Sequence, residues 1–444
     1  MTGTARLFPG ASGTPVGAGV REPLFVRTVR AFLTWGPRLD GRIVLLAAVA
    51  VYLAAVAAGR RLLGIDFWPS LGVPSGPSLF FDARNLTAAW ECQRLGYDPL
   101  YESPCDPWGR PLMYLRPWLA FGALGLNQSH TFAFAVVLIA AMFLSFTWLV
   151  GRVAAGAGLV LALAACSPAV MFAVERANMD IALFSLIAGA ILLWRARPGY
   201  SRVVSPILVL LGATAKIYPA FALGAFVVTR SRVAVRTALL CLVVFGVYCV
   251  FSVGDIAHVA AIAIQGESFS YGARILPAHL YHQVGADRWA GPAAVKQLLA
   301  AVPLAIMAAA IAIRVHRRLT AERDVWSNTT ALVALHAGAL IYLGTFTVAN
   351  NFDYRLVFLL LTLPQLVEWA SMPADRLSAL SSATLVAVIV LLWVGSLSER
   401  LHLWDELASW VVAGLLAAIV VATIPRLSSI RDVLLGAAPV DRTR

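Results

Sequence analysis

The chain has 444 residues, of which 60% are hydrophobic and only 13% are charged. A soluble surface needs more charge than this, so the composition excludes a soluble domain and indicates an all-α integral membrane protein. The formal net charge of +12 does not indicate nucleic acid as a partner, because membrane proteins concentrate basic residues in cytoplasmic loops.

About twelve apolar spans are expected between a loosely ordered N-terminal tail, residues 1–41, and a C-terminal tail, residues 425–444. Residues 42–424 then form one transmembrane domain. Several spans are shorter than the roughly 20 residues that a spanning helix prefers, so short, tilted or re-entrant helices are expected there. The predicted spans are 42–59, 131–150, 156–174, 180–194, 203–216, 218–229, 237–253, 294–313, 330–348, 355–370, 378–394 and 407–424.

Arginine clusters set the expected orientation, because basic residues favour the cytoplasmic side. With both termini in the cytoplasm, residues 60–130 form a long first extracytoplasmic loop. Within it, residues 84–95 and 111–126 are expected to be helices lying along the membrane surface. No cleavable signal peptide is recognised, so the first span is expected to be an uncleaved anchor. The cytoplasmic clusters are Arg195, Arg197 and Arg202; Arg230, Arg232 and Arg236; and Arg314, Arg317, Arg318 and Arg323.

The five cysteines fall into two groups. Cys166, Cys241 and Cys249 lie within apolar spans and are expected to be small core residues. Cys92 and Cys105 share the first polar loop. If that loop is extracytoplasmic, the two can form a disulfide, and the sequence leaves open whether they do.

Polar motifs interrupt the apolar spans, and ionisable groups beside hydrocarbon usually mark a substrate or ion path. Asp82 has two interpretations: a general base at the rim of a cavity, or the N-cap of the helix that follows. The motif from Arg176 to Asp180 is either a helix–helix turn capped by Asn178 or Asp180, or a site that binds phosphate or sugar oxygens.

Lys216 stands on an expected outer tip, against the positive-inside trend. It is either a phosphate-binding cation or a lysine that extends to the membrane interface. Asp353 and Arg355 form the last motif and are expected either to serve the site or to pair with each other. The sequence contains no phosphate-binding Gly-x-x-x-x-Gly-Lys-Ser/Thr loop, and His279-x-x-His282 lacks the partner residues of a zinc site.

The motifs occur in a distinctive order along residues 80–365. Asp82 is followed by Gly96, Asp98-Pro99 and Tyr101; then come Tyr114-Leu115-Arg116-Pro117, Arg176-Ala177-Asn178-Met179-Asp180, Lys216-Ile217-Tyr218-Pro219 and Asn351-Phe352-Asp353-Tyr354-Arg355. This pattern resembles glycosyltransferase family 87 of the GT-C superfamily, which includes polyprenyl-phosphate-sugar-dependent mannosyl- and arabinofuranosyltransferases. The chain departs from the family at Leu86 and Thr87, where aromatic residues are common, and at Arg116, which replaces a proline.

The resemblance implies a GT-C-type helix bundle in a bacterial plasma membrane, with the active site outside. Asp82 would be the general base of a single displacement, and Lys216, assisted by Arg116 or Arg355, would stabilise the leaving phosphate. The donor would be a polyprenyl-phosphate-linked hexose or pentose and the acceptor a glycan or glycolipid, with no obligatory cofactor or metal. The implied substrate-binding residues are Tyr114, Arg116, Arg176, Asn178, Asp180, Lys216, Tyr218, Asn351, Tyr354 and Arg355.

Two other classes of function stay open on the sequence. A transporter or lipid flippase also needs a polar cavity within the membrane, and a non-catalytic partner in envelope assembly needs none of the site residues. The long first loop favours the transferase, because a transporter has little use for it. The sugar, the acceptor and the oligomeric state do not follow from the sequence.

Overall fold

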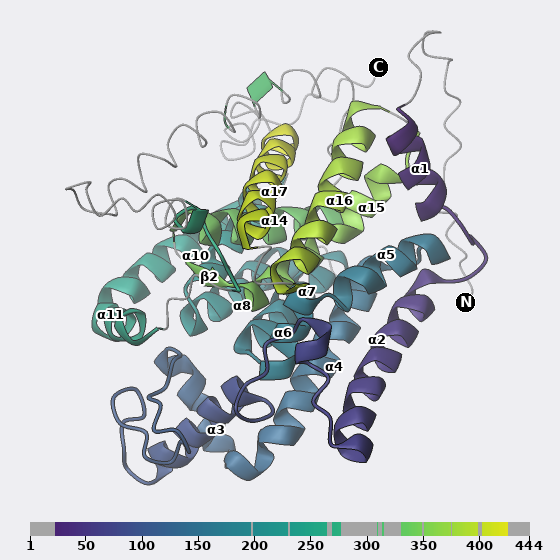
Figure 1. Cartoon of the computed structure of the whole chain (residues 1–444). Helices are drawn as coiled ribbons and strands as arrows, with labels where there is room; N and C mark the ends of the chain where they lie inside the picture. Colours follow the sequence, from purple (N-terminus) through teal and green to yellow (C-terminus); the bar gives the residue numbers. More distant parts are fainter. Residues whose placement is uncertain are drawn as a thin grey trace, which may run out of the picture.

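The computed structural model describes residues 23–196, 199–229, 231–263, 269–276, 309, 313–314, 330–348, 350–373, 375–397 and 402–424. Their regular structure is helical apart from one short antiparallel pair, β1 (Ser270–Tyr271) and β2 (Asn351–Phe352). In Figure 1, α16 and α17 lie at the top of the bundle, and α3 with the loop that follows lies at the lower left.

Among the described residues, seven helices are long and apolar enough to cross a membrane, and a bent helix pair brings the number to as many as eight. The chain is therefore an all-α integral membrane protein. The spanning candidates are α2 (Gly41–Ala58, continued by the turn Gly59–Leu63), α4 (Thr131–Val150), α7 (Met179–Ala196), α10 (Arg232–Phe251), α14 (Thr330–Val348), α16 (Arg376–Leu397) and α17 (His402–Thr423), with α5 (Ala155–Ala165) and α6 (Pro168–Arg176) as the bent pair.

The expected count of twelve spans is not confirmed. The span predicted at 203–216 is α8 (Ser201–Ala215), only 15 residues long. The spans predicted at 218–229 and 355–370 each divide into two short helices, and the span at 294–313 lies almost entirely outside the described residues. The short helices are η5 (Tyr218–Leu223) with α9 (Gly224–Val227), and η6 (Asp353–Leu361) with α15 (Leu363–Ala370).

The span predicted at 156–174 is broken between α5 and α6, which meet at an angle of 55°. Proline has no N–H group to donate, and it therefore favours the first turn of a helix. Pro168 occupies that turn in α6, and the Ser167 side chain caps it by accepting from Val170 N at 3.4 Å. At its other end α6 stops at Ala177, whose left-handed backbone (φ 44°) turns the chain into α7.

The helix α14 lies at the centre of the described bundle, beside η5, η6, α7 and α17. Close approach of backbones there requires glycine. A Cβ atom on Gly338 would lie 2.7 Å from the carbonyl oxygen of Phe358 in η6. This packing fixes η6, which carries the last of the polar motifs.

The first of the two predicted surface helices is α3 (Phe81–Arg94), and much of it is buried by neighbouring protein segments. Leu86 and Trp90 are fully buried, and Trp90 Nε1 donates to the carbonyl of Trp118 at 2.7 Å. The second predicted helix is the 3-10 helix η3 (Arg116–Leu124). The apolar face of α3 that suggested a membrane surface instead packs on η3 and α4.

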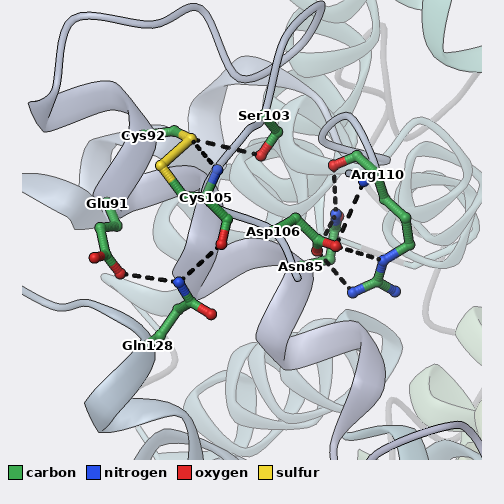
Figure 2. Close-up of a disulfide and its surroundings, with 8 residues drawn as sticks. All are labelled: Asn85, Glu91, Cys92, Ser103, Cys105, Asp106, Arg110 and Gln128. Atoms are coloured by element: carbon green, nitrogen blue, oxygen red, sulfur yellow. Dashed lines mark hydrogen bonds and ion pairs between the residues drawn. A yellow bond between two sulfur atoms is a disulfide. The ribbon is translucent and has the colours of Figure 1, made fainter. Parts of the chain in front are cut away.

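Cys92 and Cys105 are joined by a disulfide, which settles the pairing that the sequence left open. Cys92 lies in α3 and Cys105 in the loop after it, with their Cα atoms 5.6 Å apart. Gln128 adds a second link, because its side-chain amide donates to Glu91 and to the Cys105 carbonyl (Figure 2). Both links involve Cys105, so the middle of the loop is fastened to the end of α3.

The expectation of a loosely ordered tail is wrong for residues 24–33, which form the helix α1 (Leu24–Leu33). Val26 and Leu33 are buried against the bundle, so tertiary packing holds this short helix in place. Residues 1–22 and the predicted C-terminal tail from residue 425 onward lie outside the described residues.

Removing the disulfide by the double substitution Cys92→Ser and Cys105→Ser should lower stability by about 3 kcal/mol, because a cross-link restricts the unfolded chain. We expect a lower thermal midpoint, measured by intrinsic fluorescence in detergent. Cys249→Ser is the matched control, since Cys249 is a free thiol in α10. Equal midpoints for the double variant and the control would contradict the prediction.

Candidate functional site

A cavity of about 970 Å³ opens where the polar motifs meet. Its walls come from α3, the loop at 110–115, the ends of α6 and α8, α11 (Val253–Ile262) and the segment around β2. Segments that are far apart in the sequence therefore form one site. The residues predicted from sequence that line it are Asp82, Tyr114, Arg176, Asn178, Lys216, Tyr218, Asn351, Tyr354 and Arg355.

Asp82 is not the N-cap of α3. The helix begins at Phe81, and the cap position is Phe80, which has a left-handed backbone (φ 58°) and makes no side-chain cap. The Asp82 carboxylate instead accepts from Asn178 Nδ2 at 2.6 Å and from Arg176 Nη1 at 3.5 Å. Its side chain stays 15% exposed and lines the cavity, so a carboxylate oxygen is accessible to a ligand.

Asn178 caps the helix that follows it, as one of the two interpretations of its motif expected, and its side chain also contacts two other residues of the site. Its side-chain oxygen accepts from the Asp180 backbone N–H at 2.9 Å, which caps the first turn of α7. The same oxygen accepts from Lys216 Nζ at 3.4 Å, while its amide nitrogen donates to Asp82. One amide thus joins the carboxylate of the site to the lysine of the site.

Asp180 lies behind the cavity wall and is fully buried. Its Oδ1 accepts from the Lys216 ammonium and from Tyr218 Oη (2.6 Å), and its Oδ2 accepts from Arg355 Nε at 3.3 Å. Lys216 and Arg355 share the single carboxylate of Asp180, so these three side chains together keep a net positive charge. Lys216 and Arg355 remain 17% and 15% exposed and line the cavity.

Arg355 is held by Asn351 as well as by Asp180. Asn351 Oδ1 accepts from Arg355 Nη1, and Asn351 Nδ2 donates to the Thr345 carbonyl at 2.7 Å. Asn351 is itself in β2, where it pairs with Tyr271 of β1. The guanidinium is therefore preorganised before any ligand arrives, as tight anion binding requires.

Three tyrosine rings surround the lysine ammonium. The distances from Lys216 Nζ to the ring centroids of Tyr114, Tyr218 and Tyr354 are 5.3, 5.6 and 5.8 Å. Ring faces attract cations at such distances. The aromatic cage favours the charged lysine in a site that is otherwise costly for charge, and this accounts for the tyrosines in three of the motifs.

Arg116 is not brought to the cavity. It is exposed and forms ion pairs with Asp98 (2.9 Å) and Asp255 (2.8 Å). The hydrogen bonds from Arg116 hold the pKa of the Asp98 carboxyl below its usual value. Arg116 therefore links the first loop to α11. Its position outside the cavity does not support the expected contact with a leaving phosphate.

The expected pair between Asp353 and Arg355 is wrong, because Arg355 is bound to Asp180 and Asn351 instead. Asp353 points elsewhere: it is buried, and its Oδ1 has no hydrogen-bond partner among the described residues. A Cβ on Gly395 would lie 2.9 Å from Asp353 Oδ2, so Asp353 packs against α16.

Sequence reasoning missed two arginines that line the cavity, Arg110 and Arg274. Arg110 pairs with Asp106 at 2.8 Å and donates to the Phe81 carbonyl at 3.1 Å. Burial raises the pKa of the Asp106 carboxyl, but hydrogen bonds from Arg110 and the Trp108 N–H outweigh burial, so the pKa lies below its usual value. The Asp106 carbonyl also accepts from the Gly109 N–H at 2.8 Å, which closes a turn in this loop.

Both charged and apolar side chains line the cavity. Asp82 is the only carboxylate among its described lining residues, against five cations. Part of the wall is apolar: α11 contributes Ile256, Val259 and Ala260, and the end of α14 contributes Val348. Such a cavity suits an anion joined to a hydrocarbon chain. The cations are Arg110, Arg176, Lys216, Arg274 and Arg355, and the non-aromatic apolar residues are Met113, Leu115, Ile217, Ile256, Val259, Ala260, Ala263, Ile275 and Val348.

Fold and site together define an all-α integral membrane protein with a cationic cavity that contains one accessible carboxylate. Among the described residues, no three His, Cys, Asp or Glu side chains are grouped so as to hold a metal ion. In comparisons with models of protein families, with characterised proteins and with solved structures, nothing matches the chain.

Replacing Asp180 by asparagine should destabilise the protein by about 3 kcal/mol, because it leaves two largely enclosed cations without their shared counterion. The thermal midpoint of unfolding in detergent measures the loss. Asp98→Asn is the matched control, since it removes one partner of an exposed ion pair and should cost no more than about 1 kcal/mol. A smaller effect at Asp180 than at Asp98 would refute this description of the cluster.

Proposed function

We propose that the protein is a membrane glycosyltransferase that moves a hexose or pentose from a polyprenyl-phosphate donor to a hydroxyl group of a glycan or glycolipid. The observation that carries the proposal is the common cavity: one accessible carboxylate, two cations held by a buried counterion, and an apolar wall. These are the groups that a displacement on a lipid phosphosugar needs.

The donor phosphate fits the Lys216 and Arg355 end of the cavity. Both cations keep their exposed atoms toward the cavity while Asp180 fixes them from behind. Preorganised cations stabilise charge that develops on a leaving group, and this is usually the largest single contribution to such a reaction. The hydrocarbon chain would lie against the apolar residues of α11, which line the same cavity.

The reaction is a single displacement. The acceptor oxygen attacks the anomeric carbon of the sugar while Asp82 takes the hydroxyl proton, and the bond from that carbon to the phosphate oxygen breaks. Polyprenyl phosphate departs with the bonding electrons and needs no proton, because its negative charge is stabilised by the cations. One carboxylate is therefore sufficient, and Asn178 and Arg176 hold it in position.

The proposal places the cavity on the extracytoplasmic side of a bacterial plasma membrane, with both chain termini in the cytoplasm. The arginine clusters support this orientation through the positive-inside trend. The Cys92–Cys105 disulfide supports it as well, because disulfides persist in oxidising compartments. The resemblance of the motif order to glycosyltransferase family 87 leads to the same assignment.

Asp82→Asn should reduce sugar transfer at least about 100-fold, which is the low end for loss of a general base. Transfer from polyprenyl-phosphate mannose or arabinose to a glycan mixture, by purified protein, is the measurement. Asp98→Asn is the matched control in the same loop. Full activity of Asp82→Asn would remove Asp82 from the base role. Movement of the lipid across vesicles without any new glycosidic bond would identify a flippase instead.

Arg274→Gln should weaken donor binding about tenfold, the loss expected for one charge-assisted contact with phosphate. Among the described residues Arg274 has no ion pair, whereas the other cavity cations have carboxylate partners. The KM for the donor measures the change. Arg116→Gln, which alters an exposed arginine outside the cavity, should leave that KM unchanged; equal effects of both variants would contradict the assignment.

A further inference from the structure

An exposed tryptophan stands beside the cavity next to an arginine that lines it. Trp108 is 41% exposed, and its ring meets the Phe81 ring edge-on, with centroids 4.8 Å apart and an angle of 68°. The Arg110 guanidinium lies 3.6 Å from the Phe81 centroid and 5.1 Å from that of Trp108. Phe81 and Arg110 line the cavity, so Trp108 is in contact with two residues of the cavity wall.

The same alternation of cations and rings continues inward. The Arg176 guanidinium lies 5.7 Å from the Phe81 centroid and 4.9 Å from that of Phe172. Arg176 also donates to Asp82. A continuous series of rings and guanidinium groups therefore runs from exposed Trp108 to the carboxylate that would receive the acceptor proton.

The outer part of this series is rigid. Asp106 accepts from Arg110 and from Asn85, and Asn85 donates to the Arg110 carbonyl (Figure 2). Asn85 also donates to the Pro111 carbonyl. The neighbouring Cys105 is fixed by the disulfide. A binding surface on a fastened loop loses little conformational entropy when a ligand binds, which favours a role in recognition.

Sugars match this surface chemically. The C–H face of a sugar ring is apolar and can pack on an aromatic face, while its hydroxyl groups accept hydrogen bonds from guanidinium N–H groups. A hydrocarbon chain lying along this series would cover the guanidinium groups between the rings, and removing these charges from water costs free energy. The apolar α11 wall offers such a chain a better place.

We infer that Trp108 and Arg110 form a subsite for the acceptor, and that the acceptor is a glycan of at least two sugars. The terminal sugar lies at Asp82, and the sugar behind it packs on Trp108. This inference rests on the proposed function for the direction of transfer, and it names the class of acceptor. A tryptophan serving only as a membrane-interface anchor is the competing interpretation.

Binding to an array of immobilised hexose and pentose oligosaccharides tests the subsite without any donor or catalysis. The full chain is used in detergent, as wild type and as Trp108→Ala, Trp108→Tyr and Trp35→Ala. We expect the wild type to bind at least one chain of two or more sugars, and Trp108→Ala to bind it about tenfold more weakly, the loss of one stacking contact. Trp35, 61% exposed in the N-terminal region, is the matched control and should not matter.

The tyrosine variant separates stacking from folding, because it keeps an aromatic face. If it binds as weakly as the alanine variant, or if Trp108→Ala binds as well as the wild type, the subsite is refuted. Binding of no oligosaccharide by the wild type also refutes it. In transfer assays we expect Trp108→Ala to raise the acceptor KM about tenfold while kcat is kept.

The two proposals can fail separately. Tryptophan-dependent binding on the array by a protein that transfers no sugar would support the subsite and refute the transferase. Sugar transfer with an acceptor KM that is the same in wild type and Trp108→Ala would support the transferase and refute the subsite.

Discussion

The site depends on one buried carboxylate. Asp180 holds Lys216 and Arg355, which come from distant parts of the chain, and it is itself fully enclosed. Enclosing either cation without this carboxylate would cost free energy, and burying the carboxylate without the cations would also cost free energy. The three groups therefore require each other, and the helices that carry them must meet in a single arrangement. The price is that the cavity keeps a positive charge, which is available for an anionic ligand.

The remaining architecture brings a second carboxylate to that charge. The left-handed turn at Ala177 and the broken helix before it place Arg176 and Asn178 opposite the start of α3. There the disulfide-fastened loop holds the first turn of α3, including Asp82, through Asn85 and Arg110. The left-handed residue Ala177, which ends α6, is thus located where the polar groups must converge.

Sequence patterns predicted the long spans well, because α2, α4 and α14 are continuous apolar runs of sufficient length. They predicted the short elements poorly. A run of apolar residues does not distinguish a spanning helix from the pairs η5–α9 and η6–α15, which are buried by neighbours. In the site, the motifs identified Asp82 and Lys216, but Arg110 and Arg274 carry no local signal. Sequence could not show that Arg116 lies outside the cavity, because its pairing with Asp98 and Asp255 is a tertiary contact.

The contacts of Asn178 limit which substitutions the site can accept during evolution. Its amide caps α7, contacts Lys216 and contacts Asp82, so the Asp82 side and the Lys216 side of the cavity share one group. A substitution that adjusts one side moves the other. Adaptation to new substrates is therefore expected to proceed through the periphery, on the loop with Trp108 or on the wall of α11, while the inner residues show strong epistasis and change only together.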